Sequence, residues 1–322
     1  MSKALSWNRD GADWPLREHS RFVNQGHLQW HLQRLGRNHA RRVWLLHGTG
    51  ASTHSWRDVA PILAQHHEVV AVDLPGHAFT RGAVDEDLTL QGMARALVDL
   101  HAALTPQGPC GLPKAADTWI GHSAGAAVAL QVMLLQPSIV RDAVSLNGAL
   151  LPWGGKASSL FMPLARALAT NDWTTRFFVW NARRPGTVDN LLRNTGSSID
   201  DRGQALYERL AHNEAHLRNV LRMMAQWELE PFARSLPQLQ GPVTLISSAR
   251  DGTVAPSVSE RAAALIPKSS LIALPRWGHL GHEEAPAEWA SLMLQAMTTS
   301  DGAAGRPANQ ESEESRFTHP RS

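Results

Sequence analysis

The chain has 322 residues, of which 43% are hydrophobic and 19% are charged. This length and composition suit a globular protein with a core of ordinary size and exclude a fully disordered chain. The 31 Lys and Arg residues nearly balance the 29 Asp and Glu residues, so the net charge gives no reason to expect a nucleic-acid partner.

A single cysteine, Cys110, excludes an internal disulfide and a multi-cysteine zinc site, and it fits a reducing compartment. The N-terminal residues carry early charges and lack the apolar core of a signal peptide, and no apolar run is long enough to span a bilayer. We therefore expect a cytoplasmic protein without a transmembrane segment.

Short β-rich runs alternate with longer helical patterns, which is typical of a mainly parallel sheet with helices on its faces. The predicted strands cover residues 21–23, 27–35, 42–46, 68–72, 118–120, 140–146, 243–247 and 271–274. The predicted helices of this alternating part cover residues 88–104, 126–135, 257–265 and 287–297. The pattern predicts an α/β fold with a mostly parallel eight-stranded sheet.

Between residues 150 and 235 the alternation stops and helical patterns with aromatic anchors replace it. We expect this stretch to form a helical cap inserted after the sixth strand. The predicted organisation is an N-terminal segment (1–17), an α/β core (18–149 and 236–298), the cap (150–235) and a disordered tail (299–322), because the tail is rich in Gly, Ser, Glu and Arg.

The motif Gly121-His122-Ser123-Ala124-Gly125 matches G-x-S-x-G and stands between a predicted strand and a predicted helix. Such a tight turn exposes the serine at the carboxyl edge of the sheet, and small flanking residues prevent clashes with it. The motif predicts Ser123 as a nucleophile.

A serine nucleophile needs a base that is oriented by an acid, and in this architecture the acid and then the histidine follow later strands. Asp251 follows strand 243–247, and His279 follows strand 271–274. We therefore predict a catalytic set of Ser123, Asp251 and His279.

Other residues near these positions are weaker candidates. Asp142 begins its strand and so lies at the wrong end of the sheet, while Asn147 lies at the right end but lacks a negative charge. His282 stands where the last helix starts, and we expect it to cap that helix or to line the entrance to the site.

Acyl transfer also needs hydrogen-bond donors for the oxyanion of the transition state. The backbone N–H of Ala124, directly after the nucleophile, is one predicted donor. The second is expected from Thr49, in the His47-Gly48-Thr49-Gly50 loop after strand 42–46.

The chain contains 12 Trp but only one Tyr, and many aromatic side chains fall in the predicted cap. A flat apolar ligand would suit such a surface, so Trp153, Phe177, Trp180 and Trp227 are candidate substrate-binding residues above Ser123. The alternative, which we favour for most of these aromatics, is that they pack the cap onto the core.

We expect no metal site and no cofactor. His212 and His216 have a spacing that can bind a metal on one helix face, but two solvated surface histidines are the simpler interpretation. The chain has no G-x-x-x-x-G-K-[ST] loop, so any ATP-driven step would belong to a partner.

With these motifs in place, residues 18–298 resemble the α/β-hydrolase fold family. A narrower similarity, to the magnesium chelatase accessory proteins of bacteriochlorophyll biosynthesis, rests on four runs: residues 7–15, 47–58 (HGTGASTHSWRD), 73–80 (DLPGHAFT) and 121–130 (GHSAGAAVAL). Ala78 departs from the glycine expected in D-L-P-G-H-G, which concerns the shape of that loop rather than the catalytic set.

The motifs predict a serine hydrolase that acts on an apolar carboxylic ester through an acyl-serine intermediate. The resemblance implies a place near magnesium insertion in photopigment synthesis, with a tetrapyrrole as a candidate ligand and magnesium chelatase subunits as candidate partners. Two alternatives stay open: a non-catalytic factor that binds porphyrin or assists the chelatase, and a cofactor-free haloperoxidase or perhydrolase.

Overall fold

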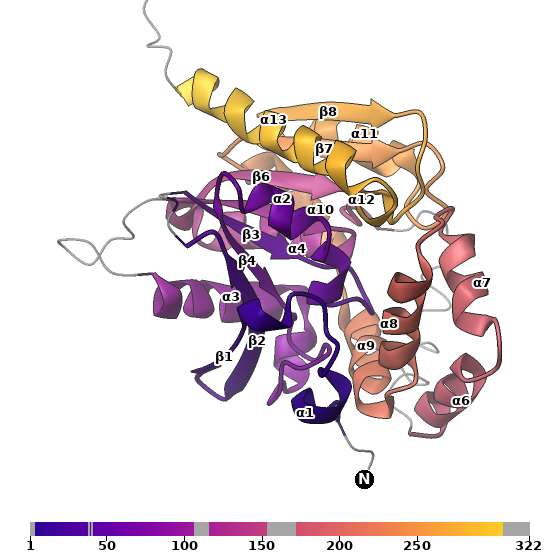
Figure 1. Cartoon of the computed structure of the whole chain (residues 1–322). Coiled ribbons are helices and arrows are strands. Elements are labelled where there is room, and N and C mark those ends of the chain that lie inside the picture. The colour runs from indigo at the N-terminus through magenta and orange to yellow at the C-terminus, as the bar shows by residue number, and fades with distance from the viewer. Residues whose placement is uncertain (1–3, 38, 40, 106–115, 153–171, 305–322) are drawn as a thin grey trace, which may run out of the picture.

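A computed structural model describes residues 4–37, 39, 41–105, 116–152 and 172–304. At its centre is one eight-stranded sheet with the strand order β1-β2-β4-β3-β5-β6-β7-β8 (Figure 1). The strands are β1 (Ser20–Gln25), β2 (Leu28–Leu35), β3 (Arg42–Leu46), β4 (Glu68–Val72), β5 (Asp117–His122), β6 (Val140–Leu146), β7 (Val243–Ser248) and β8 (Ser269–Leu274).

The first two strands form an antiparallel hairpin, and β2 also runs antiparallel to β4. All other neighbouring strands are parallel. The structure therefore confirms the predicted mostly parallel eight-stranded sheet with a helical insertion after the sixth strand. It also places the carboxyl ends of β3 and β5 to β8 at one edge, where side chains from distant parts of the chain can meet.

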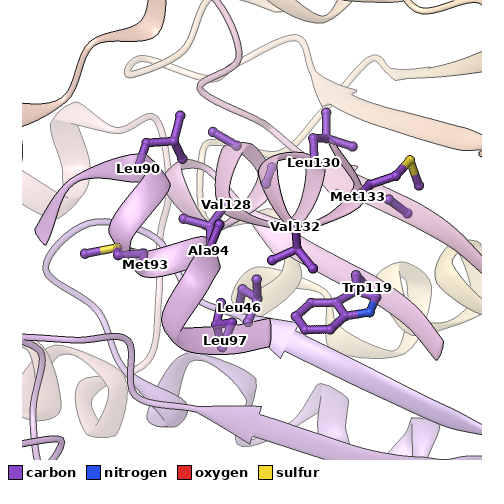
Figure 2. Packing of buried hydrophobic residues seen from close by; sticks show 14 of the residues in the cluster. Leu46, Leu90, Met93, Ala94, Leu97, Trp119, Val128, Leu130, Val132 and Met133 are labelled. Atoms are coloured by element: carbon purple, nitrogen blue, oxygen red, sulfur yellow. The ribbon is translucent and has the colours of Figure 1, made fainter. Parts of the chain in front are cut away.

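Helices cover both faces of this sheet because its central strands are apolar on both sides. Figure 2 shows Leu97 of one helix and Val132 of another packed toward Leu46 and Trp119 of the sheet. The helices of the α/β part are α1 (Trp7–Asp10), α2 (Val59–Leu63), α3 (Leu90–Leu104), α4 (Ala124–Leu135), α11 (Pro256–Leu265), α12 (Gly281–Glu284) and α13 (Pro286–Ala304). Short 3₁₀ turns are η1 (Arg17–His19), η2 (Thr53–Trp56), η3 (Asp85–Leu88), η4 (Pro137–Ile139) and η5 (Leu236–Gln238).

The insertion between β6 and β7 contains only helices among its described residues, and we call these helices the cap. They are α6 (Asp172–Ala182), α7 (Thr187–Asn194), α8 (Asp201–Ala211), α9 (Glu214–Gln226) and α10 (Leu229–Ser235). Figure 1 shows α6 to α9 on the side toward which the arrowheads of β7 and β8 point, so this part of the cap stands at the carboxyl edge of the sheet.

The N-terminal segment ties the core to the cap. The Trp14 indole N–H donates to Thr53 Oγ1 (3.2 Å) in the core. Arg209 of α8 donates to the Asp10 carbonyl and to both carboxylate oxygens of Asp13 (2.6 and 2.9 Å). This segment is therefore part of the folded unit. At the other end, α13 runs to Ala304 and so extends into the range predicted as a tail, while residues 305–322 lie outside the described residues.

Much of the tryptophan excess is structural. Five indoles are fully buried: Trp30, Trp44, Trp56, Trp119 and Trp289. Trp44 of β3 and Trp119 of β5 stack with their ring centres 4.8 Å apart and their planes at 4°. These indoles belong to the α/β core, so they do not bear on the expectation that the aromatics of the cap pack it onto the core.

Candidate active site

Ser123 occupies a sharp turn between β5 and α4. Its φ of 53° lies in a region that residues with side chains rarely adopt, as expected for a nucleophile on a strained elbow, although the residue is buried rather than exposed. The turn needs glycine on both sides, because a Cβ on Gly121 would collide with the Gly125 carbonyl and a Cβ on Gly125 would collide with the Leu46 carbonyl. The Ser123 N–H donates to the Leu146 carbonyl (2.9 Å), which anchors the elbow to the end of β6.

The loop after β3 lies directly beside this serine. A Cβ on Gly48 would stand 3.1 Å from Ser123 Cβ and 2.9 Å from His122 Nδ1, so only glycine permits this approach. Thr49 follows in the same loop and is exposed, while Ala124 is the first residue of α4, where a backbone N–H has no partner within the helix. Both predicted oxyanion donors are therefore close in the fold to Ser123.

Asp251 and His279 are brought together at the ends of β7 and β8. His279 Nδ1 lies 2.7 Å from Asp251 Oδ2, and both side chains are buried. The other carboxylate oxygen, Oδ1, accepts the backbone N–H groups of Thr253 (2.7 Å) and Val254 (2.8 Å). These two donors fix the orientation of the carboxylate, which leaves Oδ2 facing the imidazole.

Among the described residues, no hydrogen bond links Ser123 Oγ to His279. The ring of His122, next to the serine in the chain, lies 4.6 Å from the His279 ring. Catalytic hydrogen bonds of this kind often form only when substrate is bound.

The backbone carbonyl of His279 is held from two sides. His122 Nε2 donates to it at 2.8 Å, and Asn147 Nδ2 donates to it at 3.0 Å. Asn147 also accepts the N–H of Ser248 (2.9 Å), so it joins the ends of β6 and β7 to the histidine loop. Sequence reasoning weighed Asn147 only as a candidate acid, set it aside because it lacks a negative charge, and missed this role, although its place at the carboxyl end of β6 was an available signal.

Two histidines differ from their predicted settings. His282 does not line an entrance: it is buried, and its Nε2 donates to Ser55 Oγ (2.8 Å). Burial, followed by the nearby His279 and Arg57, lowers the pKa of His282 to about 3, so its ring is neutral at pH 7.

His216 is also buried, and it lies on α9 whereas His212 ends α8, so the two do not share one helix face. Its Nδ1 accepts the Ala78 N–H (3.0 Å), and its Nε2 donates to the Gly50 carbonyl (3.3 Å). Burial lowers the pKa of His216 to about 4. This histidine therefore connects the cap to the predicted oxyanion loop, a role that the sequence pattern did not indicate.

The four candidate substrate-binding aromatics are not placed alike. Trp153 lies outside the described residues, as does Cys110. Phe177 and Trp180 are on α6, each 58% exposed, whereas Trp227 is half-buried and its indole donates to the Leu88 carbonyl (3.1 Å). The geometry thus gives Trp227 a packing role and leaves the outer face of α6 open.

Two cavities lie away from the serine. A groove of about 610 Å³ runs between the starts of α3 and α10, and a smaller cavity of about 230 Å³ lies beside the N-terminal segment and α9. Neither is lined by Ser123 or His279, so the predicted apolar pocket above Ser123 stays a prediction.

In the part of the chain that the structure describes, no three His, Cys, Asp or Glu side chains are grouped to hold a metal. No helix in the described ranges is long and apolar enough to cross a bilayer.

Comparison with known proteins agrees with this architecture. Residues 41–286 match the model of the family described as alpha/beta hydrolase fold. The chain is 37% identical over 289 residues to the magnesium-chelatase 30 kDa subunit of Rhodobacter capsulatus. The aligned region covers 88% of this chain and 96% of that protein. It is 28% identical over 292 residues to 2-hydroxy-6-oxo-6-(2'-aminophenyl)hexa-2,4-dienoic acid hydrolase of Metapseudomonas resinovorans, covering 86% and 90%.

Solved structures show the same fold. A serine hydrolase involved in carbazole degradation (the CarC enzyme) superposes with a TM-score of 0.66 at 24% identity, covering 87% of this chain and 98% of that one. A thermophilic esterase from Thermogutta terrifontis gives a TM-score of 0.65 at 17% identity, covering 87% and 98%. The family model matches residues 41–286, and the sheet topology agrees with it, so this chain belongs to the α/β-hydrolase fold family.

Proposed function

We propose that the chain is a serine hydrolase that acts on an apolar carboxylic ester through an acyl-serine intermediate. The observation that carries the proposal is the 2.7 Å contact between His279 Nδ1 and Asp251 Oδ2 at the sheet edge that also holds the Ser123 elbow. Three chain segments far apart in sequence supply a nucleophile, a base and an acid, which is the combination that acyl transfer through serine requires.

In this mechanism Ser123 Oγ attacks the ester carbonyl carbon while His279 Nε2 takes the hydroxyl proton. The backbone N–H groups of Ala124 and Thr49 bind the oxyanion that forms. His279 then passes the proton to the leaving alcohol, and an acyl-serine remains. Water, activated by the same imidazole, releases the acid and restores the serine, while Asp251 holds the Nδ1–H so that Nε2 faces the substrate.

We further propose that residues 18–149 and 236–298 form the catalytic core and that residues 150–235 select the substrate. Support for the substrate class comes from the aromatic side chains of the cap and from the similarity to a protein named as a magnesium-chelatase subunit. A tetrapyrrole ester, processed beside magnesium chelatase, fits both observations.

The direct test is covalent labelling by a fluorophosphonate, which reacts with activated serines. We expect the wild-type chain to be labelled once, at Ser123, and Ser123→Ala to be unlabelled. His279→Gln keeps the serine but lacks the base, so its labelling rate should fall by about a thousandfold. An unlabelled wild-type chain that is folded by circular dichroism would contradict the proposal.

The physiological role needs a separate experiment in a host that makes bacteriochlorophyll. We expect Ser123→Ala to lower pigment and to accumulate an esterified intermediate. Normal pigment in that strain would instead favour a non-catalytic porphyrin-binding factor, which saturable quenching of Trp fluorescence by protoporphyrin would then reveal. Peracid formation from carboxylic acid and peroxide would identify perhydrolase chemistry.

A further inference from the structure

The segment Thr195–Ser197 connects the cap helices α7 and α8. It lies between the loop that carries Asp251 and the loop that carries His279. The carbonyl oxygen of Thr195 accepts two backbone hydrogen bonds, one from the Gly252 N–H (3.0 Å) and one from the His279 N–H (3.0 Å). Gly252 is the residue after Asp251. One cap atom therefore links the acid loop and the base loop directly.

The next residues of the segment add contacts with the same two loops. Ser197 is buried, and its Oγ accepts the N–H of Leu280, the residue after His279, at 2.8 Å. Gly196 has a φ of 80°, and a Cβ on it would collide with the carbonyl of Arg250, the residue before Asp251. The segment is thus in close contact on both sides.

Glycines on the facing loops permit this closeness. A Cβ on Gly278, just before the histidine, would collide with Gly196, and a Cβ on Gly252 would collide with the Asn194 carbonyl. Three glycines from three separate parts of the chain are therefore needed at one contact. Such a contact transmits displacements because it has no room for relaxation.

We propose that Thr195–Ser197 is a positioning element of the Asp251–His279 pair, so that the placement of the cap sets the alignment of the base. This inference rests on the proposed function, since it assigns a purpose to the pair. The β7 and β8 strands set where each loop begins, but the shared acceptor at Thr195 sets the distance between the loops beyond the sheet. A shift of the segment would move Nδ1 relative to Oδ2.

The decisive variant is Gly196→Ala, and the chain offers a matched control. Gly186 also lies in the cap with a φ of 76°, but the nearest atom to a Cβ there is Asn190 Nδ2 at 3.9 Å. Gly186→Ala therefore introduces the same backbone strain without touching the acid or base loop. Ser197→Ala serves as a milder second variant, because it removes one acceptor and adds no atom.

The first measurement is the NMR signal of the His279 Nδ1 proton in the full chain, assigned by its loss in His279→Gln. We expect the signal to persist in Gly186→Ala and to broaden by exchange with water in Gly196→Ala and Ser197→Ala. An unchanged signal in Ser197→Ala and in folded Gly196→Ala would overturn the positioning role. If Gly196→Ala does not fold, Ser197→Ala alone decides.

The second measurement is the pH profile of the fluorophosphonate labelling rate. Misalignment of the base should lower the rate by about tenfold or more and change the shape of the profile, whereas a loss of folded protein lowers the amplitude equally at all pH values. A wild-type chain that is never labelled, but shows the expected NMR pattern, would refute the hydrolase proposal and leave the positioning role in place. Labelling with no change in either variant would refute the positioning role alone.

Discussion

The backbone carbonyl oxygen of His279 accepts hydrogen bonds from the side chains of His122 and Asn147. Burial, followed by the nearby rings of His282 and His279, holds the pKa of His122 well below its usual value, so its ring is a neutral donor at pH 7. Asn147 has a φ of 47°, a conformation that asparagine tolerates better than most residues. Both residues hold the catalytic loop without contacting the substrate in the proposed mechanism.

Asn147→Ala should therefore lower both stability and reactivity. The change leaves the buried Ser248 N–H without an acceptor and places alanine at a positive φ, so we expect the free energy of unfolding to fall by about 2–4 kcal/mol. Urea denaturation measures this loss, and the exposed Asn190→Ala is the control, expected within about 0.5 kcal/mol of wild type. If Asn147→Ala lowered the free energy of unfolding no more than Asn190→Ala does, the stabilising role of Asn147 would be contradicted.

At the scale of elements, a buried ion pair joins η2, α12 and α8. Arg57 Nη1 donates to Glu283 Oε2 (2.6 Å), and its Nη2 donates to Asp200 Oδ1 (2.8 Å) at the start of α8. The other Glu283 oxygen accepts the Tyr207 hydroxyl and the Ser55 hydroxyl, each at 2.7 Å. Burial raises the pKa of Glu283, although the Arg57 charge opposes this shift.

Removal of one member of this pair should cost more than removal of both. Glu283→Leu leaves the Arg57 guanidinium buried without its main partner, and we expect a loss of about 3–5 kcal/mol in unfolding free energy. The double variant Arg57→Met with Glu283→Leu removes both charges and should be less destabilised than either single change. A double-mutant cycle by chemical denaturation checks this, and simple additivity would contradict it.

The sequence predicted the elements better than the contacts between them. Alternating apolar runs and the turn glycines located all eight strands. Chain order predicted Ser123, Asp251 and His279 as a catalytic set, and the structure brings Asp251 and His279 into contact. The ends of the cap helices were harder to predict. The spacing of His212 and His216 suggested one helix face, but a new helix begins after Asn213, whose side chain caps it by accepting the His216 N–H at 3.0 Å. Contacts such as Thr195 with His279 depend on how the cap docks, which no local pattern encodes.

At the scale of the whole molecule, the described residues include six buried histidines whose pKa values are lowered. Burial lowers the pKa values of a set that surrounds the site: His47, His54, His77, His122, His216 and His282. In the unfolded chain these rings titrate near the ordinary value of 6.5. Below that pH the unfolded state binds more protons than the folded state, so acid favours unfolding.

The free energy of unfolding should therefore fall as the pH drops from about 6.5 toward 4. His216→Gln keeps an acceptor and a donor in the side chain but removes one titrating group whose folded pKa is about 4. We expect this variant to flatten the dependence by up to about 1.4 kcal/mol per pH unit within that window. Denaturation curves at pH 7, 6, 5 and 4 measure the slope, and a slope equal to that of wild type would contradict the assignment.

The N-terminal segment has a consequence for the order in which the molecule is completed. Asp13 is synthesised well before its partner Arg209, which lies 196 residues later in the chain. Domains fold as their segments emerge, and contacts of long sequence separation form late. The segment can contact the core near Thr53 early, but its attachment to the cap must wait until α8 has been made.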